Sequence, residues 1–92
     1  MTEAELAERL RAAGADDAFE KIGIGLPFVV KNVVAQAGTL TVAQVAMLWM
    51  GMPNKHDRKR TRAMFELLEQ AGLAHPLDDE KESWAVDPTA SP

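Results

Sequence analysis

The segment from residue 54 to residue 73, NKHDRKRTRAMFELLEQAGL, constrains the fold most because it has the pattern of one long amphipathic helix with a defined start and end. Asn54 or Asp57 is suited to cap its first turn, and Gly72 is suited to end it in the left-handed conformation. We therefore expect a helix at residues 55–71. At about 100° per residue, the face that would pack against a core collects Thr61, Met64, Phe65, Leu68 and Ala71.

The first half of this helix is basic, although the chain as a whole is acidic. Residues 54–62 hold five Lys and Arg against one Asp, a net charge of +4, whereas the rest of the chain holds five against thirteen carboxylates, a net charge of −8. A patch of this kind attracts a polyanion that the remaining surface repels. The alternative is that these charges are merely solvated and bind nothing. Their single sign argues against this alternative, as does the lack of acidic partners that we expect in the first two turns. The cations that share about 100° of arc opposite the buried face are Lys55, Arg58, Lys59 and Arg62.

The size and composition of the chain suit one small folded domain. It has 92 residues, of which 47% are hydrophobic and 26% charged, and it has no Cys for disulfides, thiolate metal sites or a thiol nucleophile. Its longest apolar run, VAQVAMLWMGM, is too short to cross a bilayer, and its first residues, MTEAELAERL, are acidic, unlike a signal or transit peptide. We expect a cytoplasmic protein without a membrane partner.

Two helices are expected in an N-terminal helical extension at residues 1–26. TEAE is a capping-box pattern, and two glycines supply helix ends. This predicts a first helix at about residues 3–13, with Leu6 and Leu10 on its apolar side, and a short second helix after it. The residues expected to begin and end the two helices are Thr2 with Glu5, Gly14, Asp16 or Asp17, and Gly23.

The valine-rich segment LPFVVKNVVAQAG, residues 26–38, is ambiguous because valine favours strands. Its valines do not alternate as in a strand, and they line one helical face instead. This spacing predicts a helix with Pro27 in its first turn and Gly38 after its end. The next residues, TLT, have strand propensity but need partner strands. Thr41 can then cap the helix VAQVAMLWMG, which Gly51 ends.

Two short strands, LAHPL and SWAV, are expected after the basic helix, on either side of the polar loop DDEKE. Leu73 is expected to fold back onto the helix, and Pro76 would confine its strand to a sheet edge. The tail at residues 88–92 has nothing to bury and is expected to be disordered. The residues expected to share one core are Val33, Val45, Phe65, Leu68 and Trp84.

The stretch TLTVAQVAMLWMGMPNKHDRKRTRAMFELLEQAGLAHPLDDEKESWAV resembles the winged helix-turn-helix superfamily of DNA-binding domains. The resemblance covers residues 27–87, and LLEQAGLAHPLDDEKESWAV is similar to the end of the recognition helix and the wing of many bacterial regulators. It implies that residues 42–50 form the supporting helix and residues 55–71 the recognition helix. The fold expected is mainly α with a small β-hairpin, a winged helix-turn-helix with an additional N-terminal helix.

These features predict a sequence-specific double-stranded DNA-binding protein, a small bacterial, archaeal or phage transcriptional regulator acting as a homodimer. A helix with cations on its N-terminal half can enter the major groove while its apolar half stays anchored in the core. Lys and Arg there neutralise phosphates, and Arg can also bind a guanine edge. The residues expected to contact DNA are Lys55, His56, Arg58, Lys59, Arg60 and Arg62.

Two other functions stay open. One is a winged-helix module that binds a protein through apolar and acidic surfaces. The other is a plasmid or phage factor that uses the same DNA contacts for partition, replication or recombination. The wing tip is acidic, which suits a solvated loop, a wing that stands clear of DNA, or a protein partner there. Its charged residues are Asp78, Asp79, Glu80, Lys81 and Glu82.

The apolar surface for dimerisation is expected either on the first helix, at Leu6 and Leu10, or at residues 47–50. We favour the first helix, because an isolated amphipathic helix gains stability only by packing. Trp49 is expected to belong to the core rather than to an interface.

No catalytic, metal or cofactor site is expected. His56 and His75 have no Cys to complete a zinc site, and the two serines have no base with an orienting carboxylate. GIGLP lacks the lysine of a phosphate-binding loop, and the acidic loop lacks the ligand spacing of a calcium loop. We therefore expect a protein that is not an enzyme.

Overall fold

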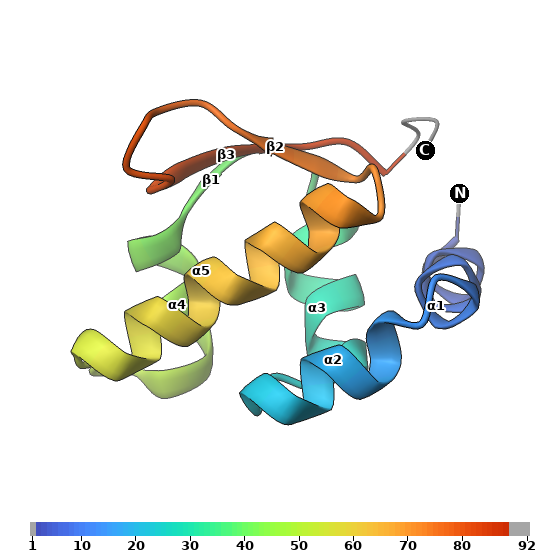
Figure 1. Ribbon diagram of the computed structural model, residues 1–92, viewed down its shortest axis with the longest axis horizontal. Coiled ribbons are helices and arrows are strands. Elements are labelled where there is room, and N and C mark those ends of the chain that lie inside the picture. The colour runs from blue at the N-terminus through green and yellow to red at the C-terminus, as the bar shows by residue number, and fades with distance from the viewer. Residues whose placement is uncertain (1, 89–92) are drawn as a thin grey trace.

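The computed structural model describes residues 2–88 and consists mainly of helices, with a small antiparallel sheet covering one side of them (Figure 1). This confirms the coarse prediction of a mainly helical chain with a small β element. The tail predicted to be disordered lies, from residue 89 on, outside the described residues. In chain order the elements are α1 Glu3–Ala12, α2 Ala15–Ile22, α3 Leu26–Val29, the π-helical turn η1 Val30–Val34, β1 Gly38–Thr41, α4 Val42–Met50, α5 Lys55–Gln70, β2 Ala74–Pro76 and β3 Ser83–Val86.

The sheet has three strands in the order β1-β3-β2, so the predicted hairpin is extended by the strand that precedes α4. Leu40 and Pro76 are both register partners of Trp84, from opposite sides of β3. The short TLT segment therefore finds the partner strand that its length requires. Pro76 lies on an edge strand, as predicted, where its missing N–H costs no ladder hydrogen bond.

The N-terminal helices follow the predicted pattern except for one cap. The Thr2 hydroxyl accepts a hydrogen bond from the Glu5 amide at 3.1 Å, which confirms the predicted N-cap of α1. The predicted cap of α2 by Asp16 or Asp17 is wrong. Gly14, with φ at 76°, joins the two helices directly and makes no side-chain cap. The two aspartates instead lie in the first turn of α2, where their negative charge interacts favourably with the positive end of the helix dipole.

The single helix predicted for the valine-rich segment is wrong in its length and form. Only α3 is an α-helix there, and it continues as a π-helical turn in which the Ala35 amide bonds to the Val30 carbonyl. The four valines predicted to share one helical face are nevertheless all buried. The helix ends before residue 37, since Ala37 and Gly38 both have positive φ and turn the chain into β1.

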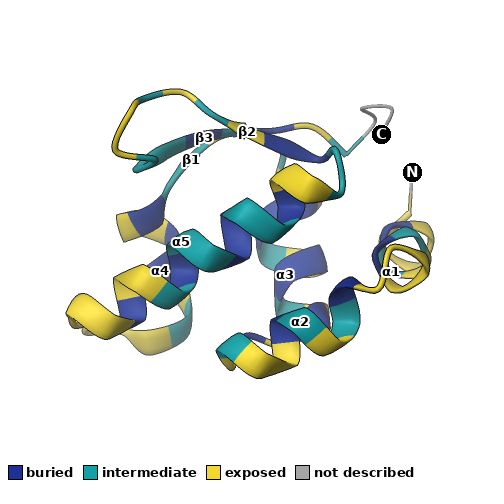
Figure 2. Ribbon diagram, viewed as in Figure 1, coloured by how far each residue is buried: buried dark blue, intermediate teal, exposed yellow. Residues whose placement is uncertain are grey.

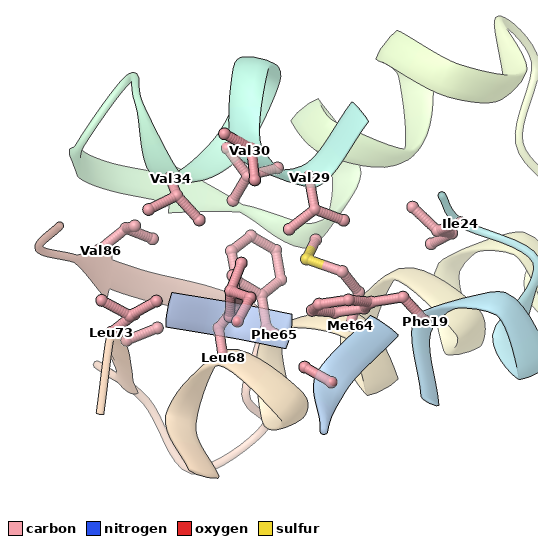
Figure 3. Packing of buried hydrophobic residues seen from close by; sticks show 14 of the residues in the cluster. Phe19, Ile24, Val29, Val30, Val34, Met64, Phe65, Leu68, Leu73 and Val86 are labelled. Carbon is pink, nitrogen blue, oxygen red and sulfur yellow. The ribbon is translucent and has the colours of Figure 1, made fainter. Parts of the chain in front are cut away.

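One hydrophobic core joins the helices to the sheet (Figure 3). Phe65 of α5 stacks on Trp84 of β3 with ring centroids 5.3 Å apart. Gly72 is left-handed, and Leu73 folds back so that its amide bonds to the Leu68 carbonyl. All five residues predicted to share the core are fully buried in this cluster.

The N-terminal helices belong to the same core. Leu6 and Leu10 of α1 and Phe19 of α2 are each at most 1% exposed and pack into the shared cluster. Dimerisation through Leu6 and Leu10 is therefore contradicted, because the apolar side of α1 is already covered by its own chain. The helix gains its packing partner within the domain, which removes the reason to expect one outside it.

The outer side of α4 and the turn after it leave apolar side chains exposed. We call this surface the α4 patch, and its members are Met47, Leu48, Met50 and Met52, with exposed fractions of 60%, 61%, 44% and 92%. Trp49 is partly buried and packs against the core. Within residues 2–88, no helix combines the length and the apolar character needed to cross a bilayer.

Candidate nucleic-acid interface

The start of α5 is fixed by a reciprocal cap between Asn54 and Asp57. The Asn54 side chain accepts a hydrogen bond from the Asp57 amide at 2.9 Å, and the Asp57 carboxylate accepts one from the Asn54 amide at 3.0 Å. Asp57 is only 4% exposed as a consequence. The one acidic residue within the basic segment is thus turned inward, and its charge is withdrawn from the surface.

The outward side of the first two turns of α5 carries exposed cations. Lys55, Arg58 and Lys59 are exposed, as is His56, in a part of α5 that is largely exposed (Figure 2). Within residues 2–88, none of the four forms an ion pair. Arg58 also donates a hydrogen bond to the Pro53 carbonyl at 3.2 Å. This surface can approach an anion without first giving up an ion pair.

Arg60 points away from these cations and ties α5 to the loop after α2. Its Nε donates to the Ile22 carbonyl at 2.7 Å, and its Nη2 donates to the Gly23 carbonyl at 3.4 Å. The guanidinium carbon lies 4.7 Å from the centre of the Trp49 ring, and Nη1 lies 3.6 Å from Asp57 Oδ1. We therefore leave Arg60 out of the candidate interface, because its donors contact Ile22, Gly23 and Asp57 of the same chain.

The approach of Arg60 also explains Gly23. The φ of Gly23 is +79°, and a Cβ there would come within 2.2 Å of Arg60 Nη2. Trp49 is held from a second side by Thr61, whose hydroxyl accepts from the indole Nε1 at 2.9 Å and donates to the Asp57 carbonyl at 2.8 Å. The start of α5 is therefore held by a network of polar contacts, in which Asp57 and Thr61 are buried and Arg60 and Trp49 are partly buried.

Arg60→Ala is expected to lower the free energy of unfolding by about 1–2 kcal/mol, because the Ile22 carbonyl loses a charge-assisted hydrogen bond at a partly exposed site. Urea unfolding followed by circular dichroism measures this. The matched control is Lys59→Ala at the exposed neighbouring position, where the change should stay within about 0.5 kcal/mol. Equal stability of the two variants would contradict a structural role for Arg60.

Arg62 also has a partner elsewhere in the chain, in the loop between β2 and β3. It forms an ion pair with Glu82, and its side chain is 30% exposed. Its Nε is buried and has no hydrogen-bond partner within the described residues. A second ion pair joins this loop to α5, since Lys81 Nζ lies 3.4 Å from Glu66 Oε2. The β2–β3 loop is therefore held by two ion pairs on the side of α5 that carries the cations.

The six residues predicted to bind DNA thus separate into two groups. Four lie together and exposed at the start of α5. Arg60 and Arg62 are held by other parts of the chain, and the expectation that the first two turns lack acidic partners is wrong, because Asp57 contacts Arg60 and Glu82 contacts Arg62. For Arg60 the helical pattern contained a signal, since its position lies outside the 100° arc of the other cations.

Among residues 2–88, no group of three His, Asp or Glu side chains is arranged to hold a metal ion.

Known proteins provide no further guide to the site. No protein-family model, no curated protein sequence and no solved structure matches this chain.

Proposed function

We propose that this protein is a winged helix-turn-helix protein that binds double-stranded DNA in a sequence-specific way, as a small bacterial, archaeal or phage regulator of transcription. The sheet order β1-β3-β2 and the succession of α4, a tight turn and α5 support this reading. In that arrangement α4 is the supporting helix, α5 enters the major groove, and the loop between β2 and β3 is the wing.

The observation that carries the proposal is the exposed cationic surface at the start of α5. Lys55, Arg58 and Lys59 are exposed on one side of a helix whose other side is anchored in the core through Phe65 and Leu68. The rest of the chain is acidic and would repel DNA in other orientations. Phosphate binding by these cations fixes the position of the helix, and Arg58 is the side chain suited to a guanine edge.

Site selection from a pool of random duplexes tests the proposal directly. The full chain should enrich a defined sequence, and the enriched duplex should bind more tightly than a shuffled duplex of the same composition. Binding without enrichment would reduce the claim to non-specific association. No binding at 50 mM salt by correctly folded protein would overturn it.

We further propose that the protein binds DNA as a homodimer through the α4 patch. One recognition helix reads too few base pairs to define a site in a genome, and pairing two of them solves this problem. The α4 patch is exposed and apolar, and it lies directly before the cationic start of α5. Pairing there would bring two α5 helices close to one two-fold axis.

Light scattering at micromolar concentration should show a dimer for the wild type and a monomer for the double variant Met47→Ser, Met50→Ser, which removes apolar area without changing charge. Leu77→Ser is the control, because Leu77 is 51% exposed but lies on the wing. A wild-type monomer, or a dimer that survives in the double variant, would contradict pairing through the α4 patch.

The second candidate is a module that binds another protein, and the α4 patch favours it. Methionine is flexible and polarisable, and it recurs on surfaces that accept varied partners. The exposed acidic residues of the wing tip, Asp79 and Glu80, give such a module a second contact surface. In this case the α4 patch would capture a partner while DNA binding stays absent at low salt.

A further inference from the structure

The wing residue Glu82 lies where a DNA phosphate would compete with its carboxylate for Arg62. Its carboxylate contacts Arg62, which lies one turn beyond Arg58 and Lys59 on the same face of α5. Arg62 is therefore the next cation in the row that faces the proposed groove. In the free protein its charge is neutralised by a carboxylate of the same chain.

The position of Glu82 is set by its backbone and not by chance packing of a loose loop. Its amide donates to Asp78 Oδ1 at 2.9 Å, and its carbonyl accepts from the Val42 amide at 2.8 Å. Asp78 Oδ1 also accepts from the Ser83 amide at 3.0 Å, which closes the wing loop. Figure 1 shows this loop at the same end of the molecule as the first turns of α5.

We infer that Glu82 acts as a built-in competitor for phosphate at Arg62 and thereby limits the affinity of α5 for DNA. This inference rests on the proposed DNA binding. A carboxylate and a phosphate oxygen bind the same guanidinium donors. While Glu82 holds Arg62, this side chain cannot neutralise a DNA phosphate and so cannot release the counterion bound there. The acidic wing then has a role: it lowers binding to non-cognate DNA, where electrostatics supplies most of the affinity.

Glu82→Gln tests this inference, because it removes the charge and retains the size and the backbone contacts of the residue. Freed Arg62 should tighten binding to random-sequence duplex about five- to tenfold near 0.1 M salt. Raising the salt from 50 to 200 mM should weaken binding of the variant about 3.5 times more than it weakens binding of the wild type, because one more phosphate is neutralised. Fluorescence anisotropy with a labelled duplex measures both quantities.

Two matched variants separate the ion pair from overall charge. Glu80→Gln makes the same charge change at an exposed position of the same loop, where no ion pair forms within residues 2–88, and should have a clearly smaller effect. The variant Arg62→Gln, Glu82→Gln loses both charges and should return affinity and salt dependence to the wild-type values. Circular dichroism confirms that each variant is folded.

The outcomes distinguish this inference from the function on which it rests. If the wild type binds DNA and Glu82→Gln gains no more than Glu80→Gln, then Glu82 does not compete for Arg62 and the inference is overturned. If the double variant keeps the tighter binding, the gain does not pass through Arg62, and the inference fails equally. Absence of binding by both wild type and Glu82→Gln at 50 mM salt would overturn the proposed function itself.

Discussion

Leu68→Ala is expected to lower the free energy of unfolding by about 2–5 kcal/mol, because it leaves a cavity in the hydrophobic core that the described helices and strands share. Leu68 is fully buried on α5, and its carbonyl accepts the hydrogen bond from the Leu73 amide that turns the chain into β2. Its neighbours in Figure 3 come from the helices and from the sheet, so several elements lose contacts together. Urea unfolding of the wild type and the variant gives the difference.

Leu48→Ala is the control for this prediction. It is the same substitution at a position that is 61% exposed on α4, and it should change the free energy of unfolding by no more than about 0.5 kcal/mol. A loss near zero at Leu68 would mean that α5 packs through a different face. Core packing would then no longer explain why the cationic face of α5 is turned outward.

The double variant Arg58→Glu, Lys59→Glu is expected to weaken binding to duplex DNA by at least about 100-fold at 0.1 M salt. Two of the three exposed Lys and Arg side chains proposed to contact phosphates are lost, and two carboxylates then face the phosphates. The fold should tolerate the change, because both positions are exposed and acidic residues suit the first turns of a helix. Binding is measured by anisotropy, and stability by thermal unfolding.

Lys21→Glu, Lys31→Glu is the matched control for that reversal. It makes the same change in net charge at two exposed positions on α2 and η1, away from the start of α5. The control should lower affinity much less, since its charges lie outside the proposed interface. Equal losses in the two double variants would show that overall charge governs binding and that the start of α5 is not the site.

The sequence predicted α5 well because its signals are local. The cap was expected at Asn54 or Asp57, and the structure places it at Asn54. The cap, the end at Gly72 and most of the buried face all depend on residues within a few turns of one another. The cap of α4 by Thr41 was predicted for the same reason and is confirmed. Ala71 was expected on the buried face but is only partly buried, because it lies at the end of the helix.

The features that the sequence did not predict depend on chain segments far apart in sequence. Arg60 meets Ile22 and Gly23, which are 38 and 37 residues away, and Arg62 meets Glu82 across 20 residues. A helical pattern shows which face a side chain occupies but not which loop returns to cover it. The π-helical turn was missed for a different reason, since a periodicity of 3.6 residues does not describe a turn with bonds from i to i+5.

The most direct test of the central claim is the salt dependence of binding to random-sequence duplex DNA, with the stoichiometry determined in the same experiment. Within residues 2–88, Lys55, Arg58 and Lys59 form no ion pair, whereas Arg60 and Arg62 are held by other parts of the chain. We therefore expect log K to fall with log salt with a slope of about −3 per bound chain. The sequence alone predicted a slope of about −4, from four to five contacts. No binding at 50 mM salt, or binding that does not change with salt, would contradict DNA recognition by the basic half of α5.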